Sequence, residues 1–159
     1  MIQGFHDKRK KYEIARVVSG LTRALYSTYL SCPEPADFAY GVTKHEDSRG
    51  KFAGVLKNTD SDQFSYFTAH PNITQNNHYH HNKNKKFLVV RGRAQFGFRQ
   101  ILTGEPFQQE TSGANPQVVG TVPGWSHYIT NIRSDELIVM LWTNEVFDRQ
   151  KLDTMVFKV

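Results

Sequence analysis

The stretch that decides the fold is His78-Tyr79-His80, taken together with Pro123-Gly124-Trp125-Ser126-His127 further along the chain. Side chains of a β-strand alternate between its two faces, so His78 and His80 point to one side and Tyr79 to the other. His127 follows a Pro-Gly turn and begins a later strand. In an antiparallel barrel that strand can lie across from the first, and three imidazoles then converge.

The rest of the chain after the first forty residues alternates with a period of two. Short apolar or alternating runs predict strands at residues 52–56, 64–69, 86–90, 95–101, 117–122, 127–132 and 136–142. Turn signals lie between them, among them Asp47-Ser48-Arg49-Gly50, Arg91-Gly92 and Pro123-Gly124. This spacing predicts an all-β sandwich or barrel.

The N-terminal part has a different period. From Glu13 to Leu30, apolar residues recur every three or four positions, which predicts one amphipathic helix. Pro33 and Pro35 end it. We therefore expect a helical lead over residues 1–40 and a barrel domain over residues 41–159.

Bulk composition excludes several classes of protein. The chain has 159 residues, enough for one domain with a sizeable core, and the net charge of +5 comes without any nucleic-acid-binding motif. Cys32 is the only cysteine, so no disulfide framework exists. No apolar run approaches the length of a membrane span or of a signal peptide. We expect a cytoplasmic protein that binds neither nucleic acid nor membrane.

The three histidines could hold a divalent transition metal, such as zinc, nickel or iron, because neutral imidazole is a common ligand for these ions. Lys85 stands five residues after His80. A protonated ammonium cannot ligate a metal and repels a cation. The sequence thus offers two candidate positive centres, a metal at His78, His80 and His127, or Lys85 itself.

The spacing of His78, His80 and Gly92, followed by Pro123-Gly124 and His127, resembles the two sequence motifs of cupins. Longer runs resemble the C-terminal cupin domain of bifunctional enzymes of capsular-polysaccharide and O-antigen biosynthesis: Ala24–Ser31, Gln63–Pro71, His78–His81, Lys86–Val90 and Met140–Trp142. The resemblance implies a cupin β-barrel of the jelly-roll type with a short N-terminal helix. In those enzymes the cupin domain epimerises a UDP-4-keto-6-deoxy-hexosamine at carbon 3, and a separate N-terminal domain reduces the 4-keto group.

This chain departs from that family at three positions. It has Asn76-Asn77 where the family has glycines, Lys85 where a glutamate ligand is expected, and Tyr128 where an aspartate follows the last histidine. Lys85 instead resembles a lysine of the metal-free 3,5-epimerases of dTDP-rhamnose synthesis, which holds the keto oxygen of the substrate and also stands seven residues before a glycine. No Gly-rich dinucleotide fingerprint occurs, so no nicotinamide cofactor is expected in this chain.

The resemblance predicts a sugar-nucleotide 3-epimerase that removes the proton next to a ketone. We expect His80 and Lys85 to be catalytic, as base and electrophile. Substrate-binding residues are expected on neighbouring strand faces: Arg91, Arg99, Tyr79 and Tyr128. For the general acid, Tyr128 and Glu145 are the candidates.

Two other functions stay open on the sequence. One is a non-catalytic sugar-nucleotide-binding or assembly domain with a degenerate metal site, and the other is a different metal-dependent cupin enzyme acting on small acids. A Lys85 side chain that points into the barrel favours catalysis, and one that points outward favours the binding domain. A homodimer is expected, because pairing protects free sheet edges, and a separate reductase is a candidate partner.

Overall fold

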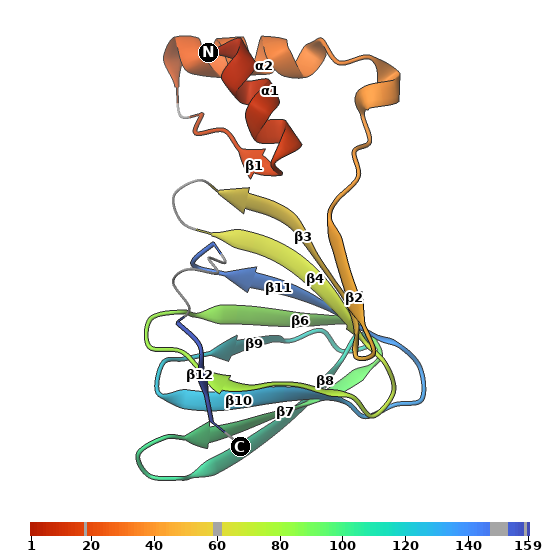
Figure 1. Cartoon of the computed structure of the whole chain (residues 1–159), viewed down its shortest axis with the longest axis vertical. Helices are drawn as coiled ribbons and strands as arrows, with labels where there is room; N and C mark the ends of the chain where they lie inside the picture. The colour runs from red at the N-terminus through yellow and green to blue at the C-terminus, as the bar shows by residue number, and fades with distance from the viewer. Residues whose placement is uncertain (18, 59–61, 147–152, 158) are drawn as a thin grey trace.

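Two β-sheets packed face to face form the body of the molecule, and two helices lie at one end of it (Figure 1). The computed structural model describes residues 1–17, 19–58, 62–146, 153–157 and 159. One sheet has the strand order β1-β3-β4-β11-β6-β9, with β2 paired to β3, and the other has the order β12-β5-β10-β7-β8. This arrangement confirms the predicted all-β, cupin-like fold with helices at the N-terminus.

The seven-stranded sheet is antiparallel except where β1 pairs with β3 in parallel. Its strands are β1 (Glu13–Ile14), β2 (Lys44–Asp47), β3 (Gly50–Asn58), β4 (Gln63–Ala69), β6 (Lys85–Arg91), β9 (Val118–Thr121) and β11 (Leu137–Thr143). The five-stranded sheet consists of β5 (Thr74–Tyr79), β7 (Arg93–Gln100), β8 (Pro106–Ser112), β10 (Trp125–Asn131) and β12 (Met155–Val156).

The core lies between the two sheets and is built from one face of each strand. Phe67, Phe87, Val89, Val139 and Leu141 come from the first sheet, and Ala94, Phe96, Phe98 and Ile129 come from the second. Every second residue of these strands is inward, as the period of two predicts, and most inward residues are apolar, with Ser65, His127 and Asn131 as buried polar exceptions. Burial of these side chains is the main favourable term that holds the sheets together.

The N-terminal prediction was wrong in its boundaries. The expected helix over 13–30 begins only at Gly20, as α2 (Gly20–Ser31), while Glu13–Ile14 form β1; residue 18 lies outside the described residues. Gly20 has φ +64°, a left-handed conformation that interrupts a helical path before this point. A further helix, α1 (Ile2–Lys10), packs Phe5 against Tyr26 of α2.

Strands β2, β8 and β12 were not expected either. All residues of β2 and more than half of those of β8 are exposed, so neither strand carries the alternation that predicts a half-buried strand. The 3₁₀ turn at Pro35–Asp37 links α2 to β2. None of the helices in the described part of the chain is both long and apolar enough to cross a membrane.

Candidate functional site

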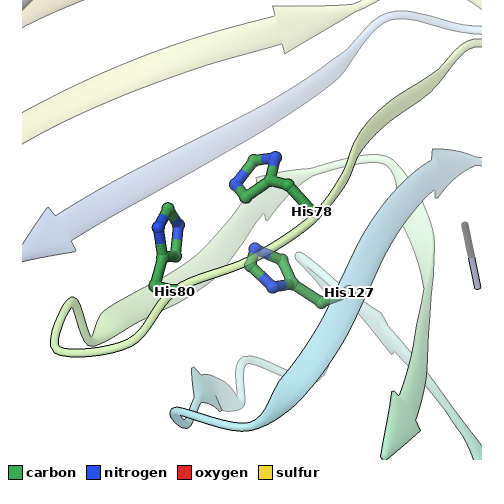
Figure 2. Close-up of side chains that lie close together, drawn as sticks. All are labelled: His78, His80 and His127. Carbon is green, nitrogen blue, oxygen red and sulfur yellow. The ribbon is translucent and has the colours of Figure 1, made fainter. Parts of the chain in front are cut away.

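Three histidines from two paired strands face one another inside the sandwich (Figure 2). His78 lies on β5 and is the antiparallel partner of His127 on β10, and His80 follows β5 by one residue. The ring centroids of His78 and His80 are 4.7 Å apart, and the ring centroids of His78 and His127 are 4.8 Å apart. The structure therefore brings together the three residues that strand alternation predicted to converge.

A bulge in β5 aims His78 inward. The pairing of β5 with β10 shifts between His127 and Tyr128, so that Asn77 is an extra residue. Gln75 faces the interior cavity. Because side chains alternate along a strand, His78, three residues later, would point outward without this extra residue. Asn76 and Asn77 have φ of 82° and 71°, and asparagine tolerates this left-handed region better than other residues with a side chain. The Asn-for-Gly departure therefore keeps the backbone conformation that the site needs.

The interior is polar at one end of the sandwich. β4 and β6 begin there, and β5 and β11 end there, so their terminal inward residues surround one space. The resulting cavity has a volume of about 560 Å³, with Phe67, Phe87 and Leu141 on its apolar side. Its polar lining includes Gln63, Ser65, His78, Lys83, Lys85 and Thr143. A cavity of this size and composition suits a small polar ligand.

Lys85 points into this cavity. It is the first residue of β6, on the same strand face as the buried Phe87 and Val89. Its Nζ lies 2.9 Å from Nε2 of His78, within hydrogen-bond distance. Burial, helped by the positive charge of Lys83, lowers the pKa of Lys85 to about 7. Near neutral pH this amine can therefore both donate and accept a proton.

The three histidines are neutral at physiological pH. Burial, followed by the charge of Lys85, lowers the pKa of His78 to about 3, of His80 to about 4 and of His127 to about 2. Among the described residues, both ring nitrogens of His127 and Nε2 of His80 are buried without a hydrogen-bond partner. These nitrogens are available for a ligand or a substrate proton.

Asp153 holds the segment that carries His80. Its carboxylate accepts hydrogen bonds from the backbone N–H groups of His81, Asn82 and Lys83, at 2.9, 2.9 and 3.1 Å. Its backbone oxygen accepts a hydrogen bond from Nδ1 of His80, which leaves Nε2 as the lone-pair nitrogen. Burial would raise the pKa of Asp153, but the three N–H groups outweigh it and lower the pKa to about 2.

The structure does not bring the predicted substrate-binding residues to this cavity. Arg91 stands at the opposite end of β6 from Lys85, about 20 Å away at the rise of a strand, and is exposed. The pairing of β6 with β11 shifts between Val89 and Arg91, so Arg91 lies beside the outward Ile138 and does not share the face of Lys85. Arg99 and Tyr128 lie on the outer face of the second sheet, opposite to their inward neighbours Phe98 and His127. The structure thus places these residues outside the cavity, and their role in substrate binding stays a prediction.

Tyr128 and Tyr79 are held on the outer surface by specific neighbours. A side chain on Gly97 would meet the Tyr128 ring at 2.1 Å, so Tyr128 lies flat over that glycine, and its hydroxyl accepts a hydrogen bond from Gln108. The Tyr79 ring contacts His81 and Phe157. Of the two candidate general acids, only Glu145 lines the cavity.

Several cavity residues were missed by sequence reasoning. Ser65 and Gln63 lie on the same strand face as Phe67, so a polar residue at a core-facing position was the available signal. Lys83 is buried and lies in the loop between the histidines and β6, where no periodicity applies. Asp153 gave no signal, because it is more than seventy positions away from the backbone groups that it binds.

The donor set is a poor fit for a divalent metal. The nearest nitrogens of the three histidines lie within 4.8 Å of one another, and the described residues add no carboxylate to this group. Nε2 of His78 is within hydrogen-bond distance of Lys85, so a metal would have to compete for that lone pair beside a cation. The histidines alone are suited to zinc, nickel or iron, but Lys85 opposes such an ion.

The chain resembles known proteins over almost all of its length. It is 54% identical over 155 residues, 98% of the chain, to UDP-2-acetamido-2,6-beta-L-arabino-hexul-4-ose reductase of Pseudomonas aeruginosa. It is 34% identical to the capsular polysaccharide assembling protein CapF of Staphylococcus aureus, with a TM-score of 0.94 over 99% of the chain. The chain spans 42% of the length of each of these two relatives.

A more distant likeness concerns the fold alone. A mutant of Bacillus subtilis oxalate decarboxylase OxdC has a TM-score of 0.56 at 17% identity over 67% of the chain.

The family described as polysaccharide biosynthesis C-terminal domain matches residues 45–155, which contain every residue of the cavity and of the histidine cluster. The chain belongs to this family of polysaccharide biosynthesis C-terminal domains.

Proposed function

We propose that the chain takes part in capsular-polysaccharide sugar-nucleotide biosynthesis as a 3-epimerase of a UDP-4-keto-6-deoxy-hexosamine. The observation that carries this proposal is the joint presence of His80 and Lys85 in one polar cavity. Support also comes from the relatives, one named as a reductase of a UDP-hexul-4-ose and the other as a capsular polysaccharide assembling protein.

His80 is the proposed base. Its Nδ1–H is donated to the backbone of Asp153, so Nε2 presents the lone pair. In the proposed reaction the C3–H bond breaks, its proton goes to Nε2 of His80, and the electron pair moves toward the ketone oxygen as an enolate. Such a step requires a neutral imidazole, and the lowered pKa of His80, about 4, keeps it neutral.

Lys85 is the proposed electrophile. An ammonium placed at the ketone oxygen stabilises negative charge that develops in the transition state, and it does so most strongly inside a cavity with an apolar wall. Reprotonation of carbon 3 from the opposite face then completes the inversion. Glu145 is the proposed source of that proton, because it lines the same cavity.

The test is solvent exchange at carbon 3. The purified chain is incubated in deuterated water, with a chelator present, together with an enzymatically prepared UDP-4-keto-6-deoxy-hexosamine, and the carbon 3 proton is followed by NMR. We expect the proton signal to disappear with wild type, to be retained with Lys85→Met, and to disappear normally with the matched control Lys86→Met. Lys86 is the exposed neighbour on the outer face, over Trp142.

A non-catalytic sugar-nucleotide-binding domain is the alternative. It would bind the UDP-sugar, detectable by calorimetry, without exchange at carbon 3 in either chelated or metal-supplemented buffer. The inward orientation of Lys85 favours the catalytic proposal, since a side chain kept only for assembly has no need to be buried beside three histidines.

Assembly is also a proposal. We propose a homodimer, because pairing protects free sheet edges, and a functional association with a reductase, because one relative is named as a reductase. Light scattering of the purified chain measures the dimer, and a monomeric mass at micromolar concentration would contradict it.

A further inference from the structure

The histidine cluster already contains a positive group supplied by the chain itself. His78, His80 and His127 offer one nitrogen each, all within 4.8 Å of one another, which is the arrangement that three-histidine metal sites use. Lys85 reaches the cluster from β6, in the opposite sheet, and its Nζ is 2.9 Å from Nε2 of His78. A metal ion that binds Nε2 of His78 would therefore have to displace the amine of Lys85 from this position.

Two physical effects oppose a metal ion here. The lone pair on Nε2 of His78 accepts a hydrogen bond from Lys85, and it cannot be given to a metal at the same time. When Lys85 is protonated, its charge also repels a divalent cation. Protonated Lys85 can only donate, which fixes the direction of this hydrogen bond, and a neutral amine keeps the same position beside Nε2 of His78.

We propose that Lys85 takes the place of the divalent metal in this three-histidine centre and excludes transition-metal ions from it. The proposal concerns ion binding and does not depend on the epimerase activity. It also makes a specific structural claim, which is that a single side chain on β6 decides whether the cluster binds a metal.

A glutamate at position 85 should convert the cluster into a metal site. Its side chain is shorter than that of lysine, so a carboxylate oxygen would stand back from His78 and leave a gap. Metal–nitrogen and metal–oxygen bonds of about 2.0–2.2 Å can fill such a gap from both sides. The variant would then present three imidazoles and one carboxylate, a complete tetrahedral donor set.

The experiment measures zinc affinity by calorimetry and by competition with a chromophoric chelator at pH 6.0, where Lys85 is protonated and the three histidines are neutral. Wild type, Lys85→Glu and the matched control Lys86→Glu are compared, the last two having the same net charge. Lys86 is exposed and its Nζ lies over the Trp142 ring, outside the cluster. We expect Lys85→Glu to bind one zinc at least about 100-fold more tightly than wild type, and Lys86→Glu to match wild type.

Two further variants keep the test decisive. Adding His127→Asn to Lys85→Glu should abolish the gained affinity, which locates the ion at the cluster. If Lys85→Glu fails to fold, as judged by circular dichroism, Lys85→Gln serves in its place, and we expect zinc binding at least about 10-fold tighter than wild type because the positive charge is gone.

The proposal is overturned if wild type retains one equivalent of zinc after dialysis and binds it as tightly as Lys85→Glu. Weaker zinc binding by Lys85→Gln than by wild type would also overturn it, because Lys85 would then be a metal ligand. The histidine ring nitrogens supply a second readout, independent of affinity. Their ¹⁵N resonances in wild type should not move when one equivalent of zinc is added.

Discussion

Adjacent histidines in this chain have different environments, and this separates their roles. His80 is buried with Nδ1 bound to Asp153, whereas His81 is exposed beside Tyr79. We predict that His80→Gln lowers the rate of exchange at carbon 3 by about 10²–10⁴-fold, the usual contribution of a general base. The measurement is the NMR exchange assay with the UDP-sugar.

The matched control is His81→Gln, one residue further along the chain and on the outer face. It should leave the exchange rate unchanged, because its ring does not reach the cavity. Equal loss of activity in both variants would show that the segment matters only for folding.

The bulge at Asn77 gives a prediction of stability. With φ of 71°, Asn77 has a left-handed backbone conformation, in which Cβ comes too close to the following carbonyl oxygen. An asparagine side chain can offset this steric cost by a local hydrogen bond, whereas alanine cannot. Asn77→Ala should lower the free energy of unfolding by ~1–2 kcal/mol, and Asn77→Gly should leave it nearly unchanged. Urea unfolding of the two variants measures the difference, and equal stabilities would contradict the proposed role of the left-handed conformation.

The C-terminal strand β12 pairs with the end of β5 that carries His78 and Tyr79. Met155 and Val156 pair with Tyr79 and His78, and the hydroxyl of Ser126 donates to the backbone oxygen of Phe157 at 2.5 Å. Just before β12, the carboxylate of Asp153 accepts hydrogen bonds from three backbone N–H groups of the loop that follows His80. This element therefore positions His80 from outside the cavity.

We predict that Asp153→Ala lowers the free energy of unfolding by about 1–3 kcal/mol, because three N–H groups lose a charged acceptor. The folded pKa of Asp153, about 2, is below the unfolded value near 4, so its stabilising effect is present above pH 4 and is lost as pH falls through 2. Urea unfolding from pH 5 to pH 2 should show the difference between wild type and variant shrinking. A constant difference would mean that the carboxylate charge is not involved.

At the scale of the whole molecule, buried bases make stability depend on pH. The pKa values of His78, His80 and His127 in the folded protein are about 3, 4 and 2, all below the unfolded value near 6.5. Their contribution to stability is full above pH 6.5 and is lost as pH falls toward the folded values. Lys85, with a folded pKa of about 7, adds stability as pH rises from 7 toward 10.5.

We therefore predict that the free energy of unfolding, measured with urea in the presence of a chelator, rises from pH 5 to pH 7 and again from pH 7 to pH 9. Each histidine that takes up a proton only in the unfolded chain adds at most about 1.4 kcal/mol per pH unit. A flat profile between pH 5 and pH 7 would show that the histidines titrate normally in the folded protein.

Much of the fold could be predicted because alternation records burial directly. Strands β4, β6, β7, β10 and β11 alternate between inward and outward residues, many of the inward ones apolar, and all five coincide with predicted runs. Strand β2 is exposed throughout and β8 over more than half of its residues, so neither has such a pattern. Pairing with a neighbouring strand, which sequence periodicity does not record, is what makes them strands.

The sequence by itself determined that His78 and His80 share a strand face and that His127 follows a turn that begins a strand. The pairing of β5 with β10 and the bulge at Asn77, which bring the three together, were decided by the tertiary structure. The sequence also determined that Lys85 shares a face with Phe87 and Val89. Only the tertiary structure decided that Arg91, Arg99 and Tyr128 lie away from the cavity, because alternation gives a side of a strand but neither its end nor which side is inward. The link between Asp153 and His80 was likewise decided by folding, because it joins the His80 ring to a backbone oxygen 73 positions away in the chain.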